Sequence, residues 1–216
     1  MMNRKNSRSS EPANIDSPEI VEKRVAVFAK IRDVPFCFDY HKNYTKSFIA
    51  TSISTGKPCG CGIKSIALAD CLRDLGYQAR YITAEYTWSE TFTRLGIPIP
   101  QHIYQLSSQL PASLHIFLKA KINRAWIILD PTWDIGLIKS RFPVNSDWNG
   151  TQNTKIAVAP VANTFKEFNT ELELIEFKNE RATGLKTKGQ QRDLLQFCRF
   201  QSHFNQWVES IRAQHG

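Results

Sequence analysis

Cys61 is the residue in this sequence whose position most directly indicates chemistry. It follows Gly60 in a Gly/Pro/Cys turn and begins the helix-compatible run Ile63–Leu75, which stops at Gly76. A thiol at a helix start lies beside the positive end of the helix dipole and the unpaired N–H groups of the first turn. Both favour the thiolate, the nucleophilic form of cysteine. Cys61 is therefore a candidate nucleophile for a carbonyl, and it requires a base and a group that orients the base.

A predicted β-hairpin supplies such a pair. Two apolar runs, Leu114–Lys121 and Ala125–Asp130, are separated by a short turn. If the turn residues are Ile122–Asn123, His115 lies directly opposite Asp130. Directly paired residues share a sheet face, with Cβ atoms about 4.5–5.5 Å apart.

The pairing tolerates a small error in the turn. A one-residue change moves the partner of His115 to Pro131 or Thr132 and still leaves Asp130 close. An Asp beside a His can select the imidazole tautomer and stabilise its cation. With Cys61 against that face, the hypothesis is a Cys–His–Asp triad that attacks an amide through a thioacyl intermediate.

Each residue also has a structural interpretation. A lone Cys in an apolar run is more often a small core residue, and Asp130–Pro131 is a common strand ending. Trp126, on the His face, either shields the triad or fills core, and Cys71 and Cys198 are predicted as core.

Two further thiol roles stay open. Cys59 could be a resolving partner for Cys61. A zinc site from Cys59, Cys61 and Cys71 is disfavoured, because the last two lie roughly 15 Å apart along one helix. We expect no metal and no cofactor.

Composition sets the broad class. The 216 residues are 42% hydrophobic and 22% charged, which permits a packed core. The five cysteines are odd in number, and the polar N-terminus lacks the apolar core of a secretory signal, so free thiols in a reducing cytoplasm are expected. No apolar run approaches the ~20 residues that span a bilayer.

The formal net charge is +8, part of it in residues 1–16, which are predicted to form a disordered basic tail. The basic tail could simply provide solubility or could bind nucleic acid. No zinc-finger spacing, phosphate loop or aromatic RNA-binding motif supports nucleic-acid binding.

Pattern and turn residues predict the remaining elements. The clearest are a helix from Pro18, capped by Ser17, to Arg32; a strand at Gln78–Thr87; and an amphipathic helix at Gln190–Gln214. The weaker ones are a short helix in Thr45–Ser54, a long connection at Trp88–Ala112, an irregular Pro131–Gly150, a strand at Lys155–Pro160, a short helix or turn at Asn163–Asn169, a helix or strand at Glu171–Phe177, and a loop at Arg181–Gly189.

These motifs together resemble the transglutaminase-like superfamily, the papain-related cysteine acyltransferases, peptidases and amidases. The resemblance covers about Ile20 to Asp134. It is carried by Val27–Phe38, by Gly60–Cys61 with Lys64–Ser65, by Leu68, Leu72, Leu75, Gly76 and Ala79–Arg80, by His115, and by Ala125–Thr132.

The resemblance implies an α+β papain-like core in which the nucleophile helix packs on an antiparallel sheet, followed by a C-terminal helix. It implies one domain over residues 17–216, with its core at 20–134 and an extension at 135–216. Cys61 would be the nucleophile, His115 the general base and acid, and Asp130 the orienter. The spacing to Arg80 favours Cys61 over Cys59.

An oxyanion hole would use the Cys61 N–H and an upstream donor, with Asn43 or Tyr44 as candidates that no motif supports. The expected function is a cysteine-dependent amide or peptide hydrolase, or an acyltransferase. The expected partner is a peptide or protein amide, with an amine as a possible acceptor.

The alternatives are a protein-glutamine transglutaminase or deamidase, acyl transfer to an arylamine, and an inert binding or scaffold protein. The last conflicts with the presence of all three triad residue types. Substrate and oligomeric state are not predicted.

Overall fold

The computed structural model describes residues 17–38, 45–184 and 190–215 and has an α+β architecture. The helices are α1 Pro18–Arg32, α2 Lys46–Thr55, α3 Cys61–Asp74, α4 Trp88–Leu95, α5 Gln101–Ser107, the 3₁₀ helix η1 Ile135–Ser140, α6 Glu171–Gly184 and α7 Gln190–His215. The strands are β1 Ala79–Tyr86, β2 Ser113–Ile122, β3 Ala125–Leu129 and β4 Lys166–Phe168.

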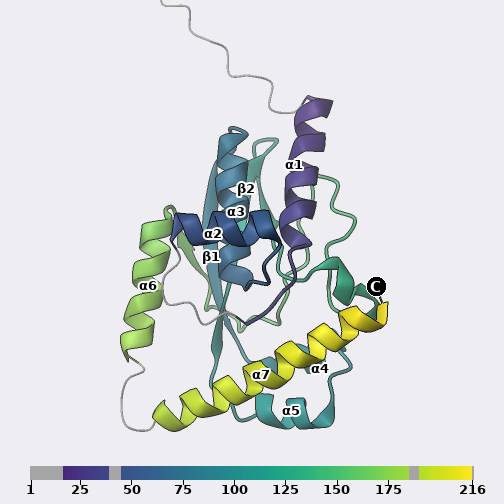
Figure 1. Cartoon of the computed structure of the whole chain (residues 1–216). Coiled ribbons are helices and arrows are strands. Elements are labelled where there is room, and N and C mark those ends of the chain that lie inside the picture. The colour runs from purple at the N-terminus through teal and green to yellow at the C-terminus, as the bar shows by residue number, and fades with distance from the viewer. Residues whose placement is uncertain (1–16, 39–44, 185–189, 216) are drawn as a thin grey trace, which may run out of the picture.

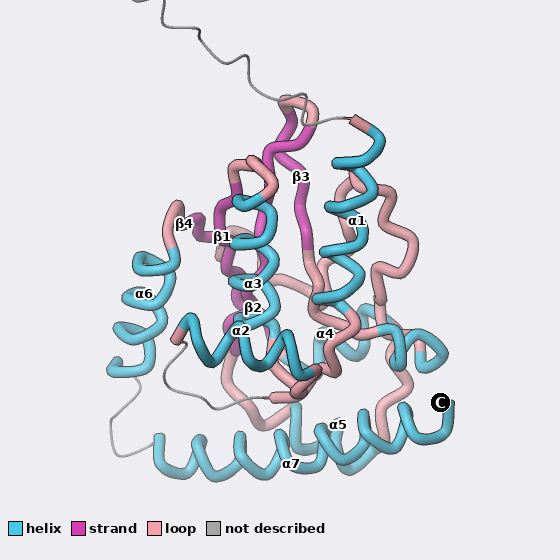
Figure 2. The backbone as a smooth tube through the Cα atoms, turned by 45° about the horizontal axis from the view of Figure 1, so that its top comes forward, coloured by secondary structure: helices cyan, strands magenta, loops and turns pink. Residues whose placement is uncertain are grey.

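The four strands form one antiparallel sheet in the order β3-β2-β1-β4. Helix α3 lies against one face of the sheet, with α1 and α2 packed on α3 (Figures 1 and 2). Apolar residues of that face, among them Tyr81, Ile116, Leu118 and Leu129, share a core with Ile63, Leu68 and Leu72 of α3. Their burial explains why the helix is apolar over most of its circumference.

The hairpin confirms the expected strands but with a different turn. Leu118 pairs with Leu129 and Ile122 with Ala125, so the two turn residues are Asn123 and Arg124. Both have positive φ, at 50° and 66°, which is the backbone of the tight two-residue turn that matches strand twist. The expected direct pairing of His115 with Asp130 is therefore wrong, because β3 ends one residue before Asp130.

Several weaker expectations are also wrong. The Trp88–Ala112 connection contains α4 and α5; α4 buries Trp88 and Phe92 and ends at Gly96, which has φ of 65°. The Asn163–Asn169 segment contains strand β4, and helix α6 continues through the start of the Arg181–Gly189 segment, whose residues 185–189 lie outside the described part.

No strand forms at Lys155–Pro160. Its backbone groups are taken by side chains, since Lys155 N donates to Asn145 and Ala157 N donates to Asp130. Pro160 alone forms a bridge, with Tyr86.

The predicted C-terminal helix, α7, crosses below the end of the sheet, beside α5 and η1 (Figure 1). Its residues Phe200 and Phe204 join an aromatic core with Phe36, Trp88 and Trp133. At the far end of α7, Arg212 forms two bonds to the buried Asp134 carboxylate, at 3.0 and 2.7 Å, and one to Phe36 O at 2.8 Å. The described part of the C-terminal extension is thus packed onto the segments that surround the sheet end.

Arg212→Ala is expected to lower the free energy of unfolding by about 2 to 3 kcal/mol, because the buried Asp134 carboxylate loses its cation. Urea denaturation measures the change. Arg199→Ala, which removes an exposed arginine from the same helix, is the control and should change stability by less than about 0.5 kcal/mol. Equal losses in the two variants would contradict the role given to the Asp134 pair.

Within the described ranges, no helix combines the length and apolarity that a bilayer crossing requires.

Candidate active site

Cys61, His115 and Asp130 lie together at one end of the sheet. Cys61 begins α3, His115 is the third residue of β2, and Asp130 directly follows β3. Since β1 runs back along α3 and β2 is antiparallel to β1, the start of α3, the start of β2 and the end of β3 meet there. His115 Nε2 is 2.7 Å from Asp130 Oδ2, and His115 lies close enough to Cys61 for each to shift the pKa of the other.

The early end of β3 leaves room for α3 beside β2. The β2–β3 ladder stops at Leu118 and Leu129, so Ile116 has no strand partner on that side. Its carbonyl instead accepts a 3.0 Å bond from Ser65 Oγ, and its backbone is near enough to Cys61 to lower the pKa of that thiol. The first turn of α3 therefore lies beside β2 where β3 has ended, and it brings the Cys61 thiol to the level of His115 along that strand.

Asp130 is held by backbone donors as well as by His115. Ala157 N donates to Oδ2 at 2.7 Å and Thr132 N to Oδ1 at 3.1 Å, and Asp130 N is itself bonded to Thr154 Oγ1. Burial raises the pKa of this carboxyl, but the charge and hydrogen bond of His115 and the two N–H donors lower it below its usual value. Asp130 is therefore an anion fixed in orientation.

His115 is 1% exposed. Phe117 stacks on its ring at 5.6 Å, and the Tyr86 ring meets it edge-on at 6.1 Å. Burial lowers the pKa of His115, but Asp130 and the interaction with Cys61 outweigh burial and raise it to about 10. Since Nε2 faces Asp130, Nδ1 is the nitrogen available to Cys61.

Cys61 is half-buried, unlike its partners. Burial raises the pKa of its thiol, but the hydrogen bond and charge of His115, together with the backbone of Ile116, lower it below the ordinary value. Within the described residues no side chain caps α3, and its first backbone bond is from Lys64 N to Gly60 O. The N–H groups of residues 61–63 thus lie beyond the helical ladder, next to the sulfur.

Lys64 forms buried hydrogen bonds that the sequence did not predict. It is fully buried, and its ammonium donates to Arg32 O at 2.8 Å and to Thr132 O at 2.9 Å. Burial lowers the pKa of Lys64 to about 8. It joins α1 and the segment after Asp130 to α3. A lysine within the mostly apolar first half of this helix was the available signal.

The other cysteines lie away from this reaction geometry. Cys59 is fully buried, with its backbone bonded to Pro35 and Cys37, so it is not presented to solvent as a resolving thiol would be. Cys71 is half-buried and Cys198 exposed, so the prediction of Cys198 as core is wrong. In the described part of the chain, no group of three or more His, Cys, Asp or Glu side chains could hold a metal ion.

Trp126 neither shields the triad nor fills the core. Its half-buried ring lies under Arg80 and Lys119, whose charged groups are 4.7 and 4.8 Å from the ring centroid. Asn43 and Tyr44 lie outside the described residues.

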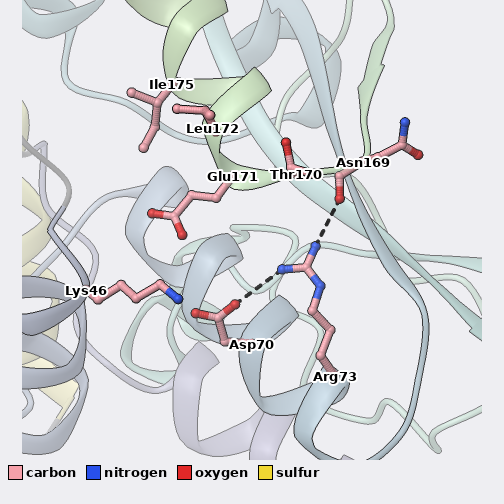
Figure 3. Close-up of a pocket in the computed structure, with 8 residues that line it drawn as sticks. All are labelled: Lys46, Asp70, Arg73, Asn169, Thr170, Glu171, Leu172 and Ile175. Carbon is pink, nitrogen blue, oxygen red and sulfur yellow. Dashed lines mark hydrogen bonds and ion pairs between the residues drawn. The ribbon is translucent and has the colours of Figure 1, made fainter.

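A pocket of about 540 Å³ lies elsewhere, between the C-terminal half of α3 and the start of α6 (Figure 3). Its Arg73 guanidinium is already bonded to Asp70, Tyr81 and two backbone carbonyls. Asp70 is nine residues from Cys61 on one helix, roughly 14 Å along the axis. The pocket is therefore separate from the candidate active site.

Comparison with known proteins adds little to this geometry. No family model matches the sequence, and no curated protein matches it. The chain is similar to the crystal structure of a candidate cysteine protease from Cytophaga hutchinsonii, with 20% identity and a TM-score of 0.34 over 68% of this chain. The similarity covers 40% of that protein, less than half its length. A likeness this weak establishes neither a shared activity nor a shared fold.

Proposed function

We propose that this protein is a cysteine-dependent hydrolase of amide or peptide bonds, with Cys61, His115 and Asp130 as its triad. The observation that supports this most is the buried His115 ring, bonded through Nε2 to Asp130 and close to Cys61 on its other side. An imidazole held between a carboxylate and a thiol is the arrangement that cysteine nucleophiles use for activation.

The steps follow from the charges. The Cys61 thiolate attacks the amide carbon, and the N–H groups at the start of α3 face the oxygen that becomes negative. The His115 imidazolium, stabilised by Asp130, then protonates the leaving amine as the C–N bond breaks. Neutral His115 removes a proton from water, whose oxygen attacks the thioester carbon. The C–S bond then breaks, which releases the acid and restores the Cys61 thiolate beside the His115 imidazolium.

Water is the acceptor in this proposal, and a peptide or protein amide is the substrate. The same groups would pass the acyl group to an amine if one displaced water. The proposal includes a transglutaminase-like core over residues 20–134 within one domain, for which the support is the resemblance of the motifs and the meeting of α3 with the sheet at His115.

The rate of iodoacetamide alkylation of Cys61 against pH tests this function. Thiolate reacts and thiol does not, so the lowered pKa of Cys61 predicts reaction at pH values below the ordinary thiol range near 8.5. As pH falls through the lowered pKa, the thiolate is lost and the rate should fall. Mass spectrometry of tryptic peptides assigns the rate to each cysteine.

The exposed Cys198 serves as an internal control in the same sample. If Cys61 in the folded protein follows the same profile as Cys198, the catalytic proposal is wrong and an inert binding role is favoured. Cys61→Ala should abolish turnover of any amide substrate that the native protein cleaves.

A further inference from the structure

Helix α6 presents one face to the sheet beside the candidate active site. Leu174 on that face is completely buried in the core that also contacts Cys61. Arg181, seven residues later, forms an ion pair with Glu85 of β1, the residue before Tyr86. Lys178 lies between them, four residues after Leu174 and three before Arg181. Helical periodicity therefore puts its side chain on the same inward face.

Both ends of this helix are fixed. At the start, Thr170 Oγ1 accepts from Glu173 N at 3.2 Å, and the Glu173 carboxylate accepts from Asn169 N at 2.8 Å. Asn169 O also accepts from Arg73 of α3 at 3.4 Å (Figure 3). With the Arg181 pair at the other end, the position of Lys178 over the sheet is determined by contacts on each side.

The Arg181–Glu85 pair places this part of α6 at the end of β1, where Glu85 pairs with Leu114, the residue before His115. The inward face of α6 therefore lies toward the end of the sheet at which Cys61 is found. Burial lowers the pKa of Lys178 to about 8, and the Cys61 thiolate acts in the opposite direction by favouring the ammonium. By the same attraction the ammonium favours the thiolate. The interaction joins α6, late in the chain, to the first residue of α3.

We propose that Lys178 is a positioning residue that places a second positive charge beside the Cys61 thiolate, in addition to the His115 imidazolium. This inference rests on the proposed function, in which that thiolate is the nucleophile. It gives α6 a role in the reaction, since the helix would hold this cation at the sulfur.

The charges around Cys61 come from several elements. Among the described residues, the titratable groups that interact with Cys61 are His115 of β2, Asp130 after β3, Tyr86 of β1 and Lys178 of α6. Burial and the Cys61 charge raise the pKa of Tyr86 well above its usual value, so Tyr86 stays neutral. Asp130 opposes the thiolate, and the two cations favour it.

Lys178→Met is the test, because methionine keeps the length of the side chain and removes the charge. We expect the alkylation profile of Cys61 to move to higher pH, which makes alkylation severalfold slower on its acidic side. Lys178→Arg, which keeps the charge, should stay close to the native profile. Thermal unfolding followed by circular dichroism establishes that each variant is folded, and Lys178→Gln replaces the methionine variant if that one is not.

Lys166→Met is the matched control. Lys166 is an exposed lysine of β4 whose ammonium lies 4.4 Å from the centroid of the Phe177 ring of α6. The variant therefore removes one lysine charge that also lies against α6. The inference about Lys178 would be overturned if Lys178→Met left the Cys61 profile unchanged, or if Lys166→Met shifted it equally. The proposed function would still stand in that case, provided that Cys61 of the native protein is alkylated at lower pH than an ordinary thiol. If the native Cys61 profile were that of an ordinary thiol, the proposed function itself would fail.

Discussion

His115→Ala is expected to lower amide turnover by about 10³-fold. The variant loses the base that takes the thiol proton and the acid that protonates the leaving amine. Because the charge and hydrogen bond of His115 lower the Cys61 pKa, the alkylation profile of Cys61 should also move up toward the ordinary thiol range. Turnover of mixed peptide amides and the alkylation profile give two separate measurements.

His102→Ala is the control for this prediction, because His102 is an exposed histidine on α5 near His203. It should leave both the turnover and the Cys61 profile unchanged. A His115→Ala protein that is folded and still shows the native alkylation profile would contradict the pairing of His115 with the thiol.

Asp130→Asn is expected to lower turnover by a similar factor, about 10³-fold, although the side chain keeps its shape. The amide carries no charge to stabilise the imidazolium, and its NH₂ group competes with the bond that orients the ring. Asp130 raises the pKa of His115, so its neutralisation should lower that pKa. His115 would then lose its proton at lower pH, and the alkaline limb of the turnover profile should move down from near 10.

Unfolding must be separated from this effect, because the Asp130 carboxylate also accepts from Ala157 N and Thr132 N. Urea denaturation of Asp130→Asn measures that loss, and turnover is compared at a temperature where the variant is folded. Asp147→Asn, at an exposed carboxylate, is the matched control. An unmoved alkaline limb in a folded Asp130→Asn protein would show that Asp130 does not set the His115 pKa.

Local pattern was enough to predict the elements that carry the candidate site. The helix after Gly60, the strand after Gly76 and the two hairpin strands depend on periodicity and turn residues, which act between neighbours in the sequence. The weaker elements failed where tertiary contacts decided the outcome. Residues 155–157 look extended and apolar, yet their N–H groups bond to Asn145 and Asp130 instead of a strand.

The register of the β2–β3 hairpin separates what the sequence could predict about the site from what it could not. A His and an Asp near the ends of two hairpin strands determined that the pair would be close, whichever turn formed. The turn at Asn123–Arg124 and the early end of β3 then decided the geometry. His115 and Asp130 meet through their side chains at 2.7 Å, beyond the last paired residues.

The sequence by itself therefore determined which residue types could react and which short elements hold them. Only the tertiary structure decided what surrounds them: Ala157 on Asp130, Tyr86 on His115, and Leu174 of α6 in the core that also contacts Cys61. The first two contacts join residues 27 and 29 positions apart. Such contacts arise from how helices and strands pack on one another, and no periodicity or spacing within a single element encodes them.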